Sequence, residues 1–204
     1  MTIPKRYRRR LPHILPDDSM VFLTCRLWGS IPNNVYSNLR QKQAALRDRL
    51  VTQKGIDPLL VETELRGRYF LDCDHYLDQC RHGAHWLKDP RIADIVAEAL
   101  HHRHPHQYFF CCYTIMSNHV HLVVRTRGEH SLADVVARMK SYTAKMANKV
   151  LQRQGPFWQA ETFDHVVRAH REDKVIRYVL DNPVKAGLVS QWDDWPYTWL
   201  NPDF

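Results

Sequence analysis

A long apolar run between Cys111 and Val124 constrains the fold of this chain more than any other segment. Its sequence, CCYTIMSNHVHLVV, has the β-branched and aromatic density of β-strands, and we expect strands at about 107–116 and 119–126. Because residues at i and i+2 of a strand face the same side, His119 and His121 stand together while Val120 points away.

Two neighbouring imidazoles can hold one divalent metal ion. The competing interpretation is a polar pair on the solvent-facing side of a half-buried strand. The tract at 101–106, HHRHPH, presents the same choice, although ending a helix and solvating a turn is its simpler interpretation.

Length and charge narrow the class of protein. The 204 residues predict a single domain spanning 1–204, and the formal charge of 29 − 22 = +7 favours an anionic partner such as nucleic acid, a phosphate ligand or an anionic membrane. The apolar runs are too short for a membrane span and no signal core follows the basic N-terminus, so we expect a cytoplasmic protein. The five cysteines (25, 73, 80, 111 and 112) contain no CxxC pair, which predicts reduced and mostly buried thiols.

Hydrophobic spacing and turn signals predict the other elements. They are a strand at 20–27, helices at about 34–53 and 59–82, a helix capped by Asp89 with Pro90 at its first position, a helix from the cap Ser131 to Leu151, a short strand within 161–168, a helix at 171–181 and an aromatic tail at 192–199. This order indicates an α+β fold with a ferredoxin-like (RRM-like) antiparallel sheet and helices on one face.

The helix that begins near Arg171 carries a second group of polar side chains. At 100° per residue Tyr178, Asn182 and Lys185 fall within a narrow arc, away from the apolar stripe, and present together to solvent or to a cleft. Pro183 disfavours helical geometry at Asn182, so the alternative is a capping Asn at the start of a new short turn, with a surface Tyr and a solvated Lys.

Other candidate residues lie elsewhere in the chain. Tyr142 is an alternative to Tyr178 as a chemically active tyrosine, but its place at the edge of an apolar helix stripe favours packing over chemistry. Basic residues that could follow a phosphate backbone, or simply form solvated surfaces, are Arg138, Lys145 and Lys149 on that helix and Lys5, Arg6, Arg8, Arg9 and Arg10 in an N-terminal arm.

Several motifs resemble one protein family. The segment 116–122, MSNHVHL, resembles the His-hydrophobic-His motif of the HUH nucleases. Tyr178 with 182–189, NPVKAGLV, resembles the catalytic helix of REP-associated tyrosine transposases, which are relatives of the single-tyrosine transposases of small insertion sequences. Further similarity covers 140–143, 155–159, 163–168 and 195–197. The resemblance is strongest over 108–199 and weaker at 22–30.

The resemblance implies the HUH nuclease fold with a helical insertion at about 33–100 after the first strand, longer than a minimal member needs, and a catalytic helix and tail at about 171–204. It implies a metal-dependent endonuclease and strand transferase that forms a 5′-phosphotyrosine on hairpin-containing, repetitive single-stranded DNA. Tyr178, not Tyr142, would be the nucleophile, and His119, His121 and Asn182 would hold Mg²⁺ or Mn²⁺. We expect a monomer or homodimer that associates with the nucleoid when it binds DNA.

Elementary chemistry agrees with that assignment. A phosphodiester repels an incoming anion, and a divalent cation reduces this repulsion. A free phenol has a pKa of about 10, so attack at neutral pH needs help, for which Lys185 is a candidate. Two rival functions are an inactive single-stranded nucleic-acid-binding protein on the same scaffold and a zinc-dependent hydrolase. The second is weaker, because no third His, Cys or carboxylate lies nearby in the sequence at a familiar zinc spacing.

Overall fold

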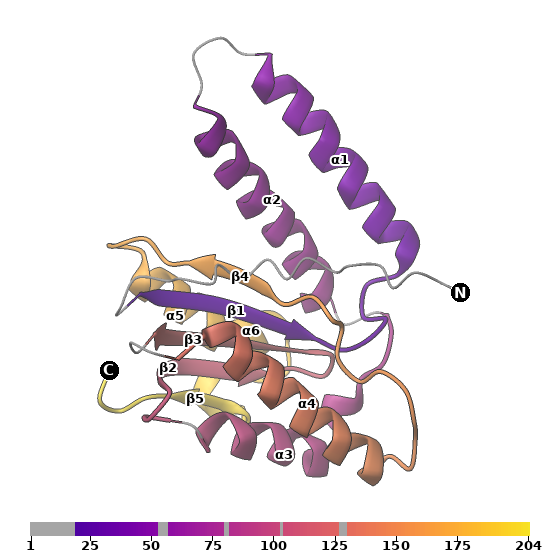
Figure 1. The fold of residues 1–204 in the computed structure, drawn as a ribbon. Helices are drawn as coiled ribbons and strands as arrows, with labels where there is room; N and C mark the ends of the chain where they lie inside the picture. Colours follow the sequence, from indigo (N-terminus) through magenta and orange to yellow (C-terminus); the bar gives the residue numbers. More distant parts are fainter. Residues whose placement is uncertain (1–18, 53–56, 80–81, 103, 127–129) are drawn as a thin grey trace.

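One antiparallel sheet organises the molecule. The computed structural model describes residues 19–52, 57–79, 82–102, 104–126 and 130–204. The sheet has the strand order β4-β1-β3-β2-β5 (Figure 1). Its strands are β1 (Met20–Arg26), β2 (Tyr108–Ile115), β3 (His119–Thr126), β4 (Phe163–Val166) and β5 (Thr198–Leu200). The predicted α+β class with an antiparallel sheet is confirmed.

The helices are α1 (Asn33–Val51), α2 (Pro58–Asp78), α3 (Pro90–His101), α4 (Leu132–Val150), α5 (Glu172–Leu180) and α6 (Asn182–Lys185). Two of them, α3 and α4, begin directly after the capping residues that the sequence predicted. The Asp89 side chain accepts a hydrogen bond from the Arg91 N–H at the start of α3, and Ser131 accepts one from the Asp134 N–H at the start of α4. These bonds satisfy N–H groups that a helix leaves without an internal partner.

Helices cover both faces of the sheet. Helices α3 and α4 pack on the face that carries Leu23, Val120 and Leu122. The opposite face carries Phe22 and Val123 and packs against α5. The expected helix layer is therefore present, and α5 adds a second one. The reason lies in the strands, because every residue of β1 is buried, as in a strand covered on both faces.

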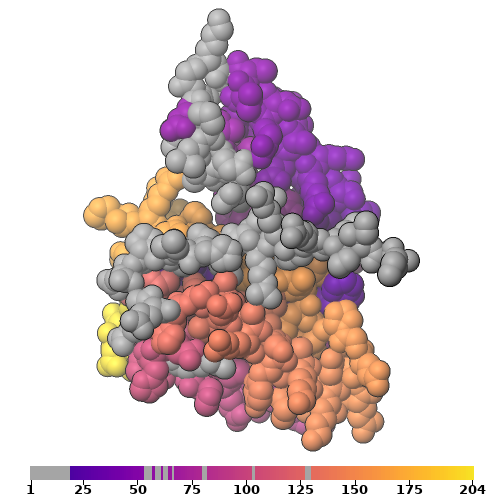
Figure 2. Space-filling view, in the orientation of Figure 1, coloured from indigo at the N-terminus to yellow at the C-terminus, as the bar shows by residue number. Residues whose placement is uncertain are grey.

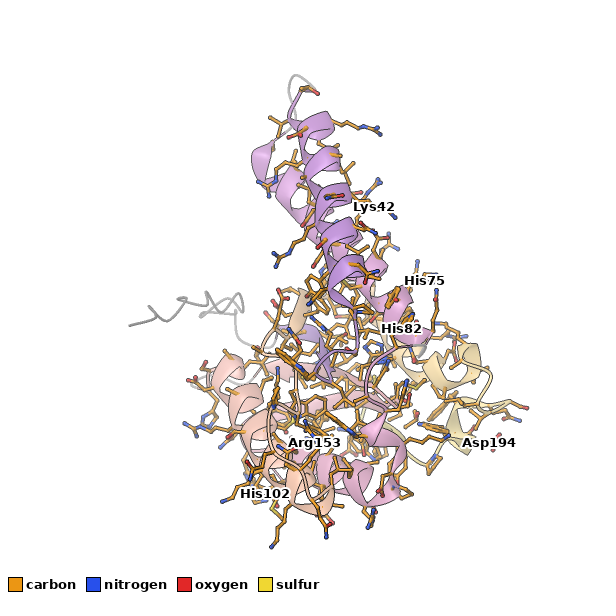
Figure 3. All side chains as sticks on the ribbon, turned by 90° about the vertical axis from the view of Figure 1, so that its right-hand side faces the viewer. Lys42, His75, His82, His102, Arg153 and Asp194 are labelled. Carbon is orange, nitrogen blue, oxygen red and sulfur yellow. The ribbon has the colours of Figure 1, made fainter. Side chains whose placement is uncertain are left out.

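Helices α1 and α2 form a hairpin that projects from the sheet beside β4 (Figure 1). The space-filling view shows the same purple hairpin in the upper part of the molecule (Figure 2). Lys42 lies about midway along it, and His75 lies nearer the sheet (Figure 3). The inner end is held by a small core that includes Leu39, Cys73, Leu77 and Phe163. The insertion therefore has one end packed beside the sheet.

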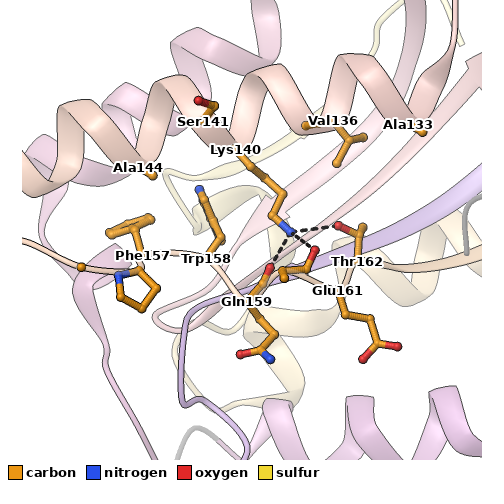
Figure 4. A pocket seen from close by; sticks show the side chains of 14 residues that line it. Ala133, Val136, Lys140, Ser141, Ala144, Phe157, Trp158, Gln159, Glu161 and Thr162 are labelled. Atoms are coloured by element: carbon orange, nitrogen blue, oxygen red, sulfur yellow. Dashed lines mark hydrogen bonds between the residues drawn. The ribbon is translucent and has the colours of Figure 1, made fainter. Parts of the chain in front are cut away.

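Lys140 ties the loop before β4 to helix α4 (Figure 4). Its Nζ donates to the carbonyl oxygens of Gln159 and Ala160 at 2.6 and 3.2 Å and to the Thr162 hydroxyl at 3.1 Å. Three acceptors around one ammonium fix the course of this loop and hence the position of Glu161 within it.

Two further sequence predictions concern thiols and membranes. Cys25, Cys73, Cys111 and Cys112 are buried free cysteines, as predicted, and Cys80 lies outside the described residues. Within the described ranges, no helix combines the length and the apolar character that a bilayer crossing requires.

We predict that Leu77→Ala lowers the free energy of unfolding by about 3 kcal/mol, because it removes a fully buried side chain where α2 packs beside the sheet. Urea unfolding measures the change. The matched control is Val51→Ala on α1, where the side chain is 68% exposed and the cost should stay within about 0.5 kcal/mol. Equal effects of the two substitutions would contradict the packing of the hairpin described above.

Candidate metal and nucleophile site

His119 and His121 form the floor of the site on β3. Both side chains are fully buried and their ring centroids lie 4.4 Å apart, so the predicted same-face pair is confirmed. His119 Nδ1 lies 2.7 Å from Asn118 Oδ1, and His121 Nδ1 lies 2.9 Å from the Thr24 hydroxyl. Because the Asn118 oxygen only accepts, His119 Nδ1 carries the hydrogen and Nε2 keeps a free lone pair.

Two carboxylates approach this pair from α2. Asp78 Oδ1 lies 3.7 Å from His119 Nε2 and 3.8 Å from His121 Nε2, while Asp74 Oδ1 lies 3.3 Å from His121 Nε2. Ligand atoms of Asp78, His119 and His121 all lie within 4.8 Å of one another. Sequence reasoning missed both aspartates, although an acidic pair at i and i+4 of an apolar helix was the available signal.

Tyr178, Asn182 and Lys185 complete the site from α5 and α6. The Tyr178 hydroxyl donates to Asp74 Oδ2, and Asn182 Nδ2 donates to Asp78 Oδ1 at 3.1 Å. Lys185 Nζ lies 3.9 Å from the centroid of the Tyr178 ring. The three side chains therefore share a face, as their spacing predicted.

The environment of that face differs from the prediction at Asn182. Asn182 is only 1% exposed, because α2 covers it, whereas Lys185 is exposed and Tyr178 lines a cavity of about 400 Å³, as the prediction of solvent or a cleft requires. A new short helix, α6, does begin at Asn182. The Asn182 side chain turns toward Asp78, however, and makes no capping hydrogen bond.

Four buried atoms at the centre point to a cation. His119 Nε2, His121 Nε2, Asp74 Oδ1 and Asn182 Oδ1 have no hydrogen-bond partner among the described residues. Leaving buried polar atoms unpaired is costly, and a divalent ion would satisfy several at once. The residues therefore fit a metal site. The sequence has no third zinc ligand near the two histidines, but α2 supplies a carboxylate in space. Sequence spacing therefore no longer counts against a zinc site.

The protonation states suit metal binding. Burial lowers the pKa of His119 well below its usual value, so the ring is a neutral ligand at neutral pH. Burial opposes ionisation of Asp78, but its interactions with His121 and His119 lower its pKa to about 2. Burial, and then the charges of Asp74 and Asp78, raise the pKa of Tyr178 well above that of a free phenol. The phenol is therefore protonated when no cation balances the carboxylates.

The other candidate residues lie away from this centre. Tyr142 is 52% exposed on α4, so the prediction that it packs was wrong, and α4 covers the sheet face opposite the histidines. Arg138, Lys145 and Lys149 are exposed on the same helix. The arm residues Lys5, Arg6, Arg8, Arg9 and Arg10 lie outside the described residues.

Comparison with known families adds independent evidence. Residues 85–182 match the family described as "Transposase IS200 like", and this range contains His119, His121, Tyr178 and Asn182. The matched range is 98 of the 204 residues, and over this range the chain is similar to that family. Asp74 and Asp78 precede the matched segment, which leaves both carboxylates in the helical insertion.

Individual relatives agree with this family. A candidate REP-associated tyrosine transposase of Haemophilus influenzae is 26% identical over 100 residues, which cover 44% of this chain and 57% of the relative. The chain thus spans little more than half the length of that relative.

Two solved structures are also similar. A REP-associated tyrosine transposase bound to a REP hairpin aligns over 94% of this chain and 81% of its own, with 13% identity and a TM-score of 0.51, which confirms the fold. A candidate transposase from Deinococcus radiodurans aligns over 89% of this chain and 98% of its own, with 14% identity and a TM-score of 0.32.

We predict that Mn²⁺ at about one hundred times its dissociation constant stabilises the wild-type protein by about 2.7 kcal/mol, because the ion binds the folded state alone. Urea unfolding with Mn²⁺ or with EDTA measures the difference. Asp78→Asn should reduce this stabilisation, whereas the matched substitution Asp72→Asn, at an exposed position of the same helix, should retain it. Equal stabilisation of both variants would exclude Asp78 as a ligand. If Mn²⁺, Mg²⁺ and Zn²⁺ all fail to stabilise the wild-type protein, the metal site is contradicted.

Proposed function

We propose that this protein is a metal-dependent endonuclease and strand transferase for hairpin-containing single-stranded DNA, with a 5′-phosphotyrosine intermediate on Tyr178. One observation carries the proposal: the Tyr178 hydroxyl and the Nε2 atoms of His119 and His121 meet the same pair of carboxylates. The match of residues 85–182 to the family described as "Transposase IS200 like" supports the reaction class. The likeness to a transposase bound to a REP hairpin supports the choice of substrate.

His119 and His121 are the metal ligands in this proposal, and Asn182 Oδ1 is the third. Asp78 lies close enough to both imidazoles to serve as a further ligand. Bound Mg²⁺ or Mn²⁺ would polarise the scissile phosphate and balance the negative charge around it. Asn118 and Thr24 hold the two imidazoles at their Nδ1 atoms, which leaves both Nε2 atoms facing the carboxylates of α2.

Tyr178 attacks phosphorus through its hydroxyl oxygen, and its proton passes to Asp74 Oδ2, which already accepts the hydrogen bond. The bond between phosphorus and the 3′ oxygen breaks, leaving a free 3′-hydroxyl once that oxygen takes up a proton. Lys185, above the phenol ring, stabilises the developing phenolate. Because the phosphotyrosine keeps the energy of the original diester, a 3′-hydroxyl of another strand reverses the step without ATP.

The partner and location follow from this chemistry. A formal charge of +7 suits a polyanionic strand. We expect the protein to act in the cytoplasm at the nucleoid, as a monomer or homodimer. An inactive binding protein on the same scaffold is the rival function, and covalent adduct formation separates the two.

We predict that Tyr178→Phe abolishes the covalent protein–DNA adduct and leaves DNA affinity within about twofold, because only the hydroxyl is removed while the ring keeps its edge contact with Phe22. The measurement uses a labelled hairpin with single-stranded flanks, Mn²⁺ or Mg²⁺, and denaturing electrophoresis.

The matched control for this variant is Tyr142→Phe, which should retain full adduct formation because Tyr142 is exposed on α4. An adduct on Tyr142 would overturn the assignment of the nucleophile. Cleavage that persists in both variants would favour a nuclease that uses water, including the zinc-dependent alternative. Metal-dependent adduct formation by the wild type would exclude the inactive binding protein.

We predict that affinity for single-stranded DNA falls with salt, with a slope of log K against log salt of roughly −0.7 for each phosphate contacted. Deleting residues 1–10 should make the slope less negative, since that arm carries five arginines and lysines. Alanine at Arg138, Lys145 and Lys149 provides the comparison, and whichever change leaves the slope unaltered identifies a surface that makes no phosphate contact.

A further inference from the structure

A cavity lies between the end of β1, the start of α1 and the loop before β4. Its volume is about 520 Å³, and it is lined by residues that include Arg26, Trp28, Tyr36, Arg40 and Glu161. Arg26 is the cross-strand partner of His119 in the β1–β3 ladder, so the two side chains lie on the same face of the sheet. A ligand in this cavity would therefore lie beside the metal site.

Arg26 is a buried cation with an unused donor. Its side chain is only 1% exposed, and its guanidinium lies 5.0 Å from the Tyr36 ring centroid and 5.4 Å from that of Phe163. Its Nη2 donates to the Tyr36 hydroxyl at 2.6 Å, but its Nε has no hydrogen-bond partner among the described residues. An unpaired donor on a buried charge is costly, and a ligand acceptor would satisfy it once the guanidinium shifts toward the cavity that Arg26 lines.

Glu161 supplies the acceptor side of the cavity. The Tyr36 hydroxyl donates to Glu161 Oε2 at 2.7 Å, which leaves Oε1 and further lone pairs for a ligand. Burial raises the pKa of Tyr36, so this hydroxyl remains a donor. Lys140 fixes the loop on both sides of Glu161 by binding Gln159, Ala160 and Thr162 (Figure 4). The carboxylate therefore projects from a preorganised loop.

Trp28 and Arg40 make the cavity chemically complementary to a nucleotide. Trp28 is 49% exposed, unusual for so large an aromatic side chain, and offers a flat surface on which a base can stack. The Arg40 guanidinium lies 5.5 Å from the Tyr36 ring centroid and brings a positive charge to the cavity, suited to a phosphate.

We propose that this cavity binds one unpaired guanine of the DNA strand, adjacent to the scissile phosphate. The proposal rests on the proposed function, because it takes single-stranded DNA as the substrate. Guanine alone among the DNA bases presents two adjacent donors, N1–H and N2–H₂, to a carboxylate, and Glu161 receives both. Guanine O6 or N7 accepts from the Arg26 side, as these atoms do from arginine elsewhere.

The test uses thymidine decamers in which one central position is guanine, adenine or cytosine, with the all-thymidine strand as reference. Fluorescence anisotropy in EDTA measures binding by the full chain without cleavage. Because the protein binds such strands in several registers, the single guanine can reach the cavity. We expect the guanine strand to bind about tenfold tighter than the other three.

Glu161→Gln should reduce this preference to about twofold or less, because the amide offers one acceptor in place of two yet can still accept from Tyr36. The matched control is Glu98→Gln, an exposed position on α3 across the sheet, which should keep the preference. Trp28→Ala should weaken all four strands by about fivefold without changing their ratio. A purely structural role for Glu161 would lower the four affinities together and leave the guanine preference in place.

Equal affinity for all four strands, or an unchanged preference in Glu161→Gln, would overturn the guanine site. If the wild type still forms the Tyr178 adduct in that case, the proposed function stands and only the cavity is misassigned. Failure to bind any of the strands would overturn both proposals.

Discussion

Asp74 and Asp78 reach His119 and His121 because the last two turns of α2 pack against the sheet face that carries both imidazoles. The aspartates of α2 and the polar groups that they meet stabilise each other. Two carboxylates one turn apart repel each other and lose hydration on burial, and the hydrogen bonds that Tyr178 and Asn182 donate to them offset part of that cost. Without α2, the Tyr178 hydroxyl would lose its acceptor.

Local signals were enough to predict the framework of the site. The alternation at 119–121 fixed the two histidines on one face, and Asp89 and Ser131 marked the helix starts that the structure shows. Each of these depends on neighbours within four residues, where backbone geometry dictates which side chains meet. The predicted fold had helices on one face of the sheet only. The apolar character of β1 on both faces explains why α5 covers the second face.

The rest of the site depends on contacts that no spacing rule encodes. Tyr178 and Asp74 are 104 positions apart, and they meet only because the hairpin turns back over the sheet. The shared face of Tyr178, Asn182 and Lys185 was therefore predicted, whereas the burial of Asn182 under α2 was not. Tyr142 is a second example of what spacing does not predict. Helical periodicity located the apolar stripe of α4, but it did not predict that Tyr142, at the edge of the stripe, is exposed.

Charge balance links the hairpin to the reaction. Because it is largely buried and has both carboxylates beside it, the Tyr178 phenol holds its proton more tightly than a free phenol does. A divalent cation among the same groups would reduce that negative field and favour the phenolate. The same cation would also relieve the repulsion between Asp74 and Asp78 that opposes the packing of α2. Metal binding, the position of the insertion and activation of the nucleophile are thus coupled through these two aspartates.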